Sequence, residues 1–203
     1  MPKNMVLALS GLVAGAVLVV VVFLFMTPAV INGTRIDPPK TVDDFTLVSD
    51  NGPVSLRDLH GKWVVMYFGY TFCPDVCPAT LSKISKALDR LGKDSSQVAV
   101  VMVTVDPERD TPEKLGAYVR RYNPNFIGLS GSLGEVDSVA RAFGIFYEKK
   151  EVSTSAGYLV DHTASVLLLD REGRINLIWP YEIEVAQMAS DLRVLLKNNG
   201  SAK

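Results

Sequence analysis

The sequence predicts an α/β sandwich of three layers, in which helices cover both faces of a mixed sheet. Two continuous apolar runs, Trp63–Phe68 and Val98–Val105, are typical of central strands with both faces buried. The amphipathic stretch between them, Pro78–Leu91, is typical of a helix that joins two parallel strands. Near the carboxyl end, Asp170–Gly173 is a hairpin signal between two apolar runs, so an antiparallel pair of strands should complete the sheet.

An uncharged apolar run of 21 residues, Val6–Met26, precedes this fold. At ~1.5 Å per residue, a helix of this length crosses a hydrocarbon core of ~30 Å. A cleaved signal peptide is the alternative, but its apolar core is usually about 7–15 residues long and ends at a small-x-small site. The stretch Met26–Ile31 is a poor site of that kind. We therefore expect a transmembrane anchor over residues 1–27.

Residues 28–41 contain Asn32-Gly33 and Pro38-Pro39, and this composition predicts a linker between the anchor and a domain over residues 42–203. A truncated chain that begins near Thr41 should therefore fold. Lys3 favours a cytoplasmic amino terminus. The domain should then face the periplasm or another extracytoplasmic space, held at the inner membrane or its equivalent.

Local signals predict the elements that lie between these landmarks. Asn51-Gly52 should turn a short hairpin formed by Phe45–Val48 and Val54–Leu56. Thr111-Pro112 should open a helix that runs to about Tyr122, because proline favours the first helical position.

Ser132 and Glu135 form a capping-box pattern, which predicts a helix through Phe143. The remaining strands and the last helix are expected at Phe126–Leu129, Ser165–Leu169, Arg174–Trp179 and Ile183–Leu196.

The composition excludes one class of partner. The 203 residues carry a net charge of −1, and the chain has no cluster of Lys and Arg and no zinc-finger spacing. Nucleic-acid binding is therefore not expected.

The only two cysteines, Cys73 and Cys77, lie between the first central strand and the helix that follows it. Ligands gather at the carboxyl ends of strands in such sheets, and Asp106 follows the second central strand at the same rim. Because Pro78 favours the first helical position, Cys77 is expected near the N-cap, where the helix dipole favours its thiolate. A structural disulfide is the plainer alternative, but so short a loop makes it a weak staple.

His162, one of two histidines, lies 85 positions beyond Cys77 and just before an expected strand. A lone histidine beside a strand is as often a structural residue as a functional one. Two sulfurs and one imidazole, brought together by the fold, suit either a soft metal or a redox exchange. The other histidine, His60, is assigned no role.

Three motifs resemble one known family. Residues 69–78 (GYTFCPDVCP), residues 103–112 (VTVDPERDTP) and residues 161–163 (DHT) are similar to the Sco/SenC proteins. These are membrane-anchored, thioredoxin-like proteins that carry copper to the CuA centre of cytochrome c oxidase. The resemblance implies a metallochaperone whose copper ligands are Cys73, Cys77 and His162, with Asp106 near the site but not a ligand. The implied partner is the CuA-bearing subunit or another copper-accepting client.

The chemistry of these side chains agrees with that implication. Thiolates select Cu(I), and an imidazole would complete a three-coordinate site. Cu(II) would require a fourth ligand, for which Asp161 and water are candidates. Zinc remains the rival metal, because two cysteines, one histidine and a water also make an open zinc site.

The alternative function is that of an extracytoplasmic thiol-disulfide oxidoreductase, with Cys73 and Cys77 as its redox pair. Dedicated oxidoreductases usually separate the two cysteines by two residues, whereas three separate them here. They also keep a proline beside the dithiol, but no proline occurs between Pro124 and Pro180. We therefore expect metal transfer as the main role, with reduction of a client as an alternative or second activity.

Overall fold

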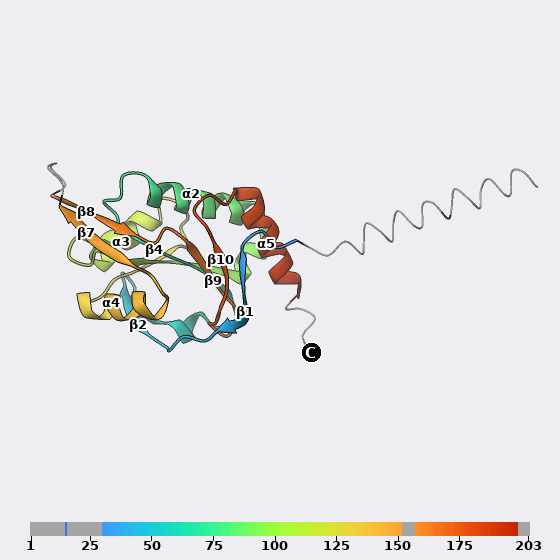
Figure 1. Cartoon of the computed structure of the whole chain (residues 1–203), viewed down its shortest axis with the longest axis horizontal. Helices are drawn as coiled ribbons and strands as arrows, with labels where there is room; N and C mark the ends of the chain where they lie inside the picture. The colour runs from blue at the N-terminus through green and yellow to red at the C-terminus, as the bar shows by residue number, and fades with distance from the viewer. Residues whose placement is uncertain (1–14, 16–29, 152–156, 199–203) are drawn as a thin grey trace, which may run out of the picture. The chain divides into compact units, whose positions relative to one another are not determined.

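The computed structural model describes residues 15, 30–151 and 157–198 (Figure 1). The chain divides into two units, Met1–Val30 and Ile31–Lys203. The expected anchor over residues 1–27 lies outside the described residues, apart from Gly15. A search of the described part finds no helix with both the length and the apolar character needed to cross a membrane.

A six-stranded mixed sheet forms the centre of the second unit, with strand order β1-β10-β9-β4-β5-β6. Strand β4 pairs in parallel with β5, and β5 with β6, whereas β9 pairs antiparallel with both β4 and β10. The parallel strands followed by an antiparallel pair confirm the predicted α/β sheet. The strands are β1 (Thr34–Lys40), β4 (Trp63–Gly69), β5 (Val98–Thr104), β6 (Ile127–Leu129), β9 (Val166–Leu169) and β10 (Ile175–Trp179).

Helices cover both faces of this sheet (Figure 1). Adjacent side chains of a strand point to opposite faces. On β4, the Tyr67 hydroxyl contacts Cys77 of helix α2 (Val76–Asp89). The next side chain, Phe68, packs its ring against Phe143 at the end of helix α4 (Leu133–Ala142). The two helices therefore lie on opposite faces, as a three-layer sandwich requires. The helices are α2 (Val76–Asp89), α3 (Pro112–Val119), α4 (Leu133–Ala142), α5 (Val185–Asn198) and the short η1 (Leu56–Leu59) and η2 (Gly92–Gln97).

The local signals in the sequence are confirmed where they predicted caps and turns. Helix α4 begins at the capping box of Ser132 and Glu135, and α3 begins after the N-cap Thr111 with Pro112 in its first turn. The hairpin of β2 (Thr46–Ser49) and β3 (Gly52–Ser55) forms as expected.

Helix α2 begins two residues earlier than expected. Its N-cap is Asp75 and its first residue is Val76, so Cys77 lies inside the first turn rather than at the cap. Pro78 is tolerated there because the first amide groups of a helix have no intrahelical acceptor. In this position Cys77 is fully buried.

A second hairpin was not predicted. Strands β7 (Tyr147–Glu151) and β8 (Tyr158–His162) pair antiparallel as a separate two-stranded sheet, with Tyr147 opposite His162. The polar sequence of β7 gives no alternating apolar pattern, and four of its five residues are exposed. The hairpin is held by hydrogen bonds between the two backbones, and no pattern of apolar side chains in the sequence predicts it.

Part of the expected linker belongs to the sheet. Strand β1 lies within residues 28–41 and pairs antiparallel with β10 at the edge of the sheet. Just before it, the buried carboxylate of Asp191 on α5 accepts hydrogen bonds from the Asn32 amide nitrogen (2.8 Å), the Asn32 side chain (2.7 Å) and the Gly33 amide nitrogen (3.0 Å). A fourth bond comes from Trp179 Nε1 at 2.9 Å. These contacts extend the folded unit back to about Ile31.

We therefore expect different stabilities for chains that begin at Ile31 and at Thr41. The shorter chain lacks β1 and three of the four donors to Asp191, so it should lose roughly 3 kcal/mol of unfolding free energy. Urea unfolding of the two truncated chains measures the difference. Asp191→Asn in the longer chain should reproduce part of the loss, and equal unfolding midpoints would show that β1 is dispensable.

Candidate metal centre

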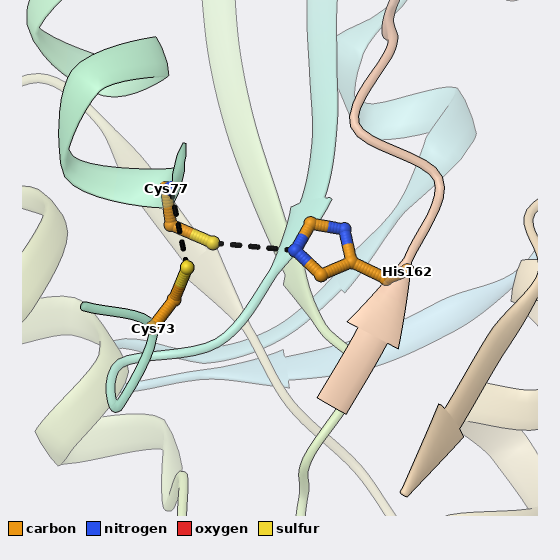
Figure 2. Close-up of side chains that lie close together, drawn as sticks. All are labelled: Cys73, Cys77 and His162. Atoms are coloured by element: carbon orange, nitrogen blue, oxygen red, sulfur yellow. Dashed lines mark hydrogen bonds between the residues drawn. The ribbon is translucent and has the colours of Figure 1, made fainter. Parts of the chain in front are cut away.

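The structure brings the three predicted side chains together (Figure 2). Cys73 lies in the loop after β4, Cys77 in the first turn of α2, and His162 at the end of β8. One ligand atom from each residue lies within 4.8 Å of the other two, and Cys77 Sγ is 3.5 Å from His162 Nε2. Within the described residues, no other group of three or more His, Cys, Asp or Glu side chains meets this criterion.

The end of β4 leaves room for the buried sulfur. Gly69 is the last residue of β4, and a Cβ atom at this position would lie only 2.8 Å from Cys77 Sγ. Cβ atoms essentially never come so close to a neighbouring heavy atom. A glycine therefore allows helix α2 to place its sulfur directly against the strand.

The imidazole of His162 is held in one tautomer. Its Nδ1 lies 3.0 Å from the Thr163 carbonyl oxygen, which can only accept a hydrogen bond, so Nδ1 carries the proton. In the neutral imidazole, the lone pair of Nε2 then faces Cys77. The rings of Tyr67 and Tyr70 contact the imidazole edge to face, at centroid distances of 6.0 and 5.9 Å. The side chain thus offers one unprotonated nitrogen in a defined direction.

The two sulfurs differ in their protonation. Cys73 is half-buried and accepts hydrogen bonds from Cys77, whose amide nitrogen is 3.4 Å from Cys73 Sγ. Hydrogen bonding from the Cys77 side chain is the largest cause that lowers the pKa of Cys73, to about 3. The same contact with Cys73, together with burial, raises the pKa of Cys77. The expectation that Cys77 would be the activated thiolate is therefore wrong, because its hydrogen bond with Cys73 and its burial both raise its pKa.

A buried hydroxyl supports the second sulfur. Tyr67 donates a hydrogen bond from its hydroxyl to Cys77 Sγ at 3.4 Å, and burial raises the pKa of Tyr67, so the hydroxyl keeps its proton. Neither cysteine takes part in a disulfide in this structure. The structural disulfide considered from the sequence is therefore not formed in it.

The other residues singled out from the sequence lie outside the group of three. Asp161 is exposed on β8, and as the neighbour of His162 along the strand it points to the opposite side. Asp106 is fully buried and its carboxylate accepts a hydrogen bond from the Tyr158 hydroxyl at 2.8 Å. His60 follows η1 as an exposed loop residue.

Comparison with known proteins gives consistent matches. The SCO1/SenC family matches residues 33–197. The mitochondrial SCO1 homolog 1 of Arabidopsis thaliana is 43% identical over 130 residues, which are 63% of this chain and 39% of that protein's length. This chain therefore spans well under half of that relative.

Two solved structures are similar to most of the chain. Apo Sco1 from Thermus thermophilus has a TM-score of 0.72 and 40% identity, and the match covers 84% of this chain and 98% of that one. The crystal structure of Arabidopsis thaliana ScoI with copper bound has a TM-score of 0.72 and 36% identity, and covers 78% and 98% of the two chains.

The low pKa of Cys73 predicts an unusual pH dependence for the reduced, metal-free protein. Because the thiolate is the reactive form, alkylation of Cys73 by iodoacetamide should stay near its maximal rate down to about pH 5. Mass spectrometry after timed alkylation measures the rate at each site. The Cys73→Ser variant is the control, since its buried Cys77 should react slowly throughout. A Cys73 rate that rises steeply up to about pH 8, as for an ordinary thiol, would contradict the assignment.

Proposed function

The chain belongs to the SCO1/SenC family, and we propose that it is a copper metallochaperone that holds its cargo between Cys73, Cys77 and His162. The proposal rests chiefly on the closeness of the two sulfurs and the imidazole nitrogen, within 4.8 Å of one another. The copper-bound structure of the similar Arabidopsis thaliana protein supports copper as the metal.

The donor set suits Cu(I). Metal bonds to thiolate and imidazole are about 2.0–2.3 Å long, so ligand atoms around one ion lie roughly 3.5–4.5 Å apart. The three atoms need only small movements to reach that spacing. Two thiolates and an imidazole favour a soft cation, and three ligands are fewer than a closed zinc site uses. Cu(II) would take water as its further ligand, because Asp161 points away.

The exposure of the site suits transfer. Cys73 is only half-buried, while Cys77 is buried and the loop between them lies at the rim of the sheet. A thiolate or imidazole of an acceptor can therefore approach the ion from the side of Cys73 and displace one ligand at a time. The acceptor that we propose is the CuA-bearing subunit of cytochrome c oxidase. An anchor over residues 1–27 would hold the domain on the extracytoplasmic side, where that subunit would receive copper.

A second function is favoured by the unequal sulfurs. A half-buried thiolate beside a buried thiol is the arrangement of an attacking and a resolving cysteine. The Cys73 thiolate would attack a client disulfide, and Cys77 would then displace the client thiol. The client gains two electrons and two thiols, and a Cys73–Cys77 disulfide is left behind. Such a step would prepare reduced cysteines in a client for metal.

The variant His162→Ala separates the two functions. Removal of Nε2 should lower the affinity for Cu(I) by roughly 10- to 100-fold, because two thiolates alone remain. Competition with a chromophoric Cu(I) chelator measures the affinity. The dithiol should still be oxidised and reduced by a glutathione buffer, since both sulfurs are intact.

The variant His60→Ala is the matched control, because it removes the other histidine from an exposed loop. Its Cu(I) affinity should equal that of the unchanged protein. If His162→Ala also binds Cu(I) with unchanged affinity, the imidazole is not a ligand and the oxidoreductase function becomes the better account.

A further inference from the structure

The strand that carries His162 is not part of the main sheet. Strands β7 and β8 form their own two-stranded sheet, whereas β4, which leads to Cys73, lies at the centre of the six-stranded sheet. Ladder hydrogen bonds therefore do not set the distance between the imidazole and the sulfurs. The position of the imidazole depends instead on the short link from His162 to β9 and on the contacts that hold β8.

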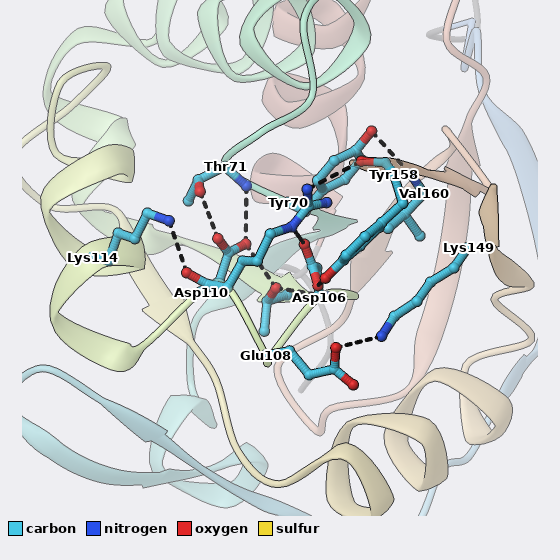
Figure 3. A network of polar contacts seen from close by, with 11 residues as sticks. Tyr70, Thr71, Asp106, Glu108, Asp110, Lys114, Lys149, Tyr158 and Val160 are labelled. Atoms are coloured by element: carbon cyan, nitrogen blue, oxygen red, sulfur yellow. Dashed lines mark hydrogen bonds and ion pairs between the residues drawn. The ribbon is translucent and has the colours of Figure 1, made fainter. Parts of the chain in front are cut away.

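The loop after β5 holds the cysteine side of the centre. The Asp110 carboxylate, fully buried, accepts hydrogen bonds from the Thr71 amide at 2.9 Å, the Thr71 hydroxyl at 2.5 Å and the Thr104 hydroxyl at 2.9 Å. Thr71 is two residues before Cys73. The start of the cysteine loop is therefore tied to the end of β5 (Figure 3).

The same loop holds the histidine side through Asp106, which lies beside Tyr158 of β8 in Figure 3, and through Arg109. The guanidinium pairs with the buried carboxylate of Asp106 through Nε and donates from Nη1 to the Tyr158 carbonyl oxygen at 3.1 Å. The other carboxylate oxygen of Asp106 accepts the Tyr158 hydroxyl at 2.8 Å. A third tie is the Val160 amide, which donates to the Tyr70 hydroxyl at 3.2 Å. Two of these three ties to β8 involve the ion pair.

Arg109 also contacts one aromatic ring from the cysteine loop and one from β8. Its guanidinium carbon is 3.6 Å from the centroid of the Tyr158 ring on β8 and 4.7 Å from that of Phe72, the neighbour of Cys73. Both distances fall within the range of cation–π contact. The planar side chain thus touches the strand that carries the imidazole and the loop that carries the half-buried sulfur.

The ion pair gives this contact its rigidity. The Asp106 side chain is fully buried and the Arg109 side chain is 16% exposed. A buried carboxylate that loses its cationic partner is strongly destabilised, so the guanidinium is kept in place. Tyr158 begins β8 and His162 ends it, and an extended strand transmits its position along its length.

We propose that Arg109 is a positioning residue for the metal centre, which holds the His162 strand at coordination distance from the sulfurs. It does so by joining Asp106, Tyr158 and Phe72. The inference rests on the proposed copper function for its effect on affinity, but the attachment of β8 is independent of any metal.

The variant Arg109→Lys tests this in the full-length chain. Lysine keeps the charge next to Asp106, but a single ammonium cannot also reach the Tyr158 carbonyl and cover both rings. In the metal-free protein, hydrogen exchange of the Val160 amide should speed up by about tenfold or more. With Cu(I), the affinity should fall by about tenfold.

A double-mutant cycle then identifies the route of the effect. If Arg109 acts through the imidazole, Arg109→Lys should cost no further affinity in a chain that already carries His162→Ala. An equal loss of affinity in both backgrounds would overturn the proposal, because Arg109 would then act on the thiols. Unchanged exchange of the Val160 amide would also overturn it. If the unchanged protein bound no Cu(I), the proposed copper function would be wrong. Hydrogen exchange of the Val160 amide would still show whether Arg109 holds β8 in place.

Lys149→Gln is the matched control. Lys149 also lies over the Tyr158 ring, at 5.0 Å from its centroid, but it pairs with the surface residue Glu108 instead of Asp106. Neither amide exchange nor Cu(I) affinity should change. Should Arg109→Lys fail to fold, Tyr158→Phe removes only the hydroxyl bond to Asp106 and should shift both measurements in the same direction by a smaller factor. No shift with Tyr158→Phe would then count against the proposal.

Discussion

The parallel pairing of β4 and β5 is the constraint on which the site depends. This pairing sets Gly69 opposite Thr104, so the carboxyl ends of both strands lie at the same end of the sheet. The Val105 amide donates to the Gly69 carbonyl oxygen at 2.9 Å and continues the pairing past the last ladder residues. The cysteine loop and the loop around Asp106 therefore leave the sheet side by side, close enough for the second loop to hold the first.

The three proposed ligands come from two supports of different kinds. The sulfurs stand on the central strand and on the first turn of α2, where burial and the close approach at Gly69 leave little freedom. The imidazole lies at the end of a separate hairpin, which is joined to the main sheet by the short link to β9 and by contacts such as that between Tyr158 and Asp106. The position of the imidazole therefore depends on contacts at the end of the sheet, whereas the sheet and α2 fix the positions of the sulfurs.

Sequence patterns predicted those features that depend on residues close together in the chain. The capping box of Ser132 and Glu135, the apolar central strands and the chemical class of the three candidate residues could all be read directly. Strand β1 was missed because it is an exposed edge strand with two prolines, which edges tolerate. The β7–β8 hairpin has a polar first strand, and the role of Arg109 depends on contacts to residues up to 49 positions away. The order of protonation of the cysteines depends on the hydrogen bond between the two sulfurs and on the burial of Cys77, which a sequence pattern does not show.

The opposite pKa shifts of the two cysteines have an electrostatic consequence for a site that binds Cu(I). Without the ion, Cys73 is anionic and Cys77 keeps its proton, so the pair carries one negative charge. With both sulfurs deprotonated around Cu(I) and the imidazole neutral, the total is again minus one. Loading thus replaces a proton on Cys77 by a monovalent cation, and unloading returns the proton. If the site carries copper as proposed, loading and unloading would leave its net charge unchanged.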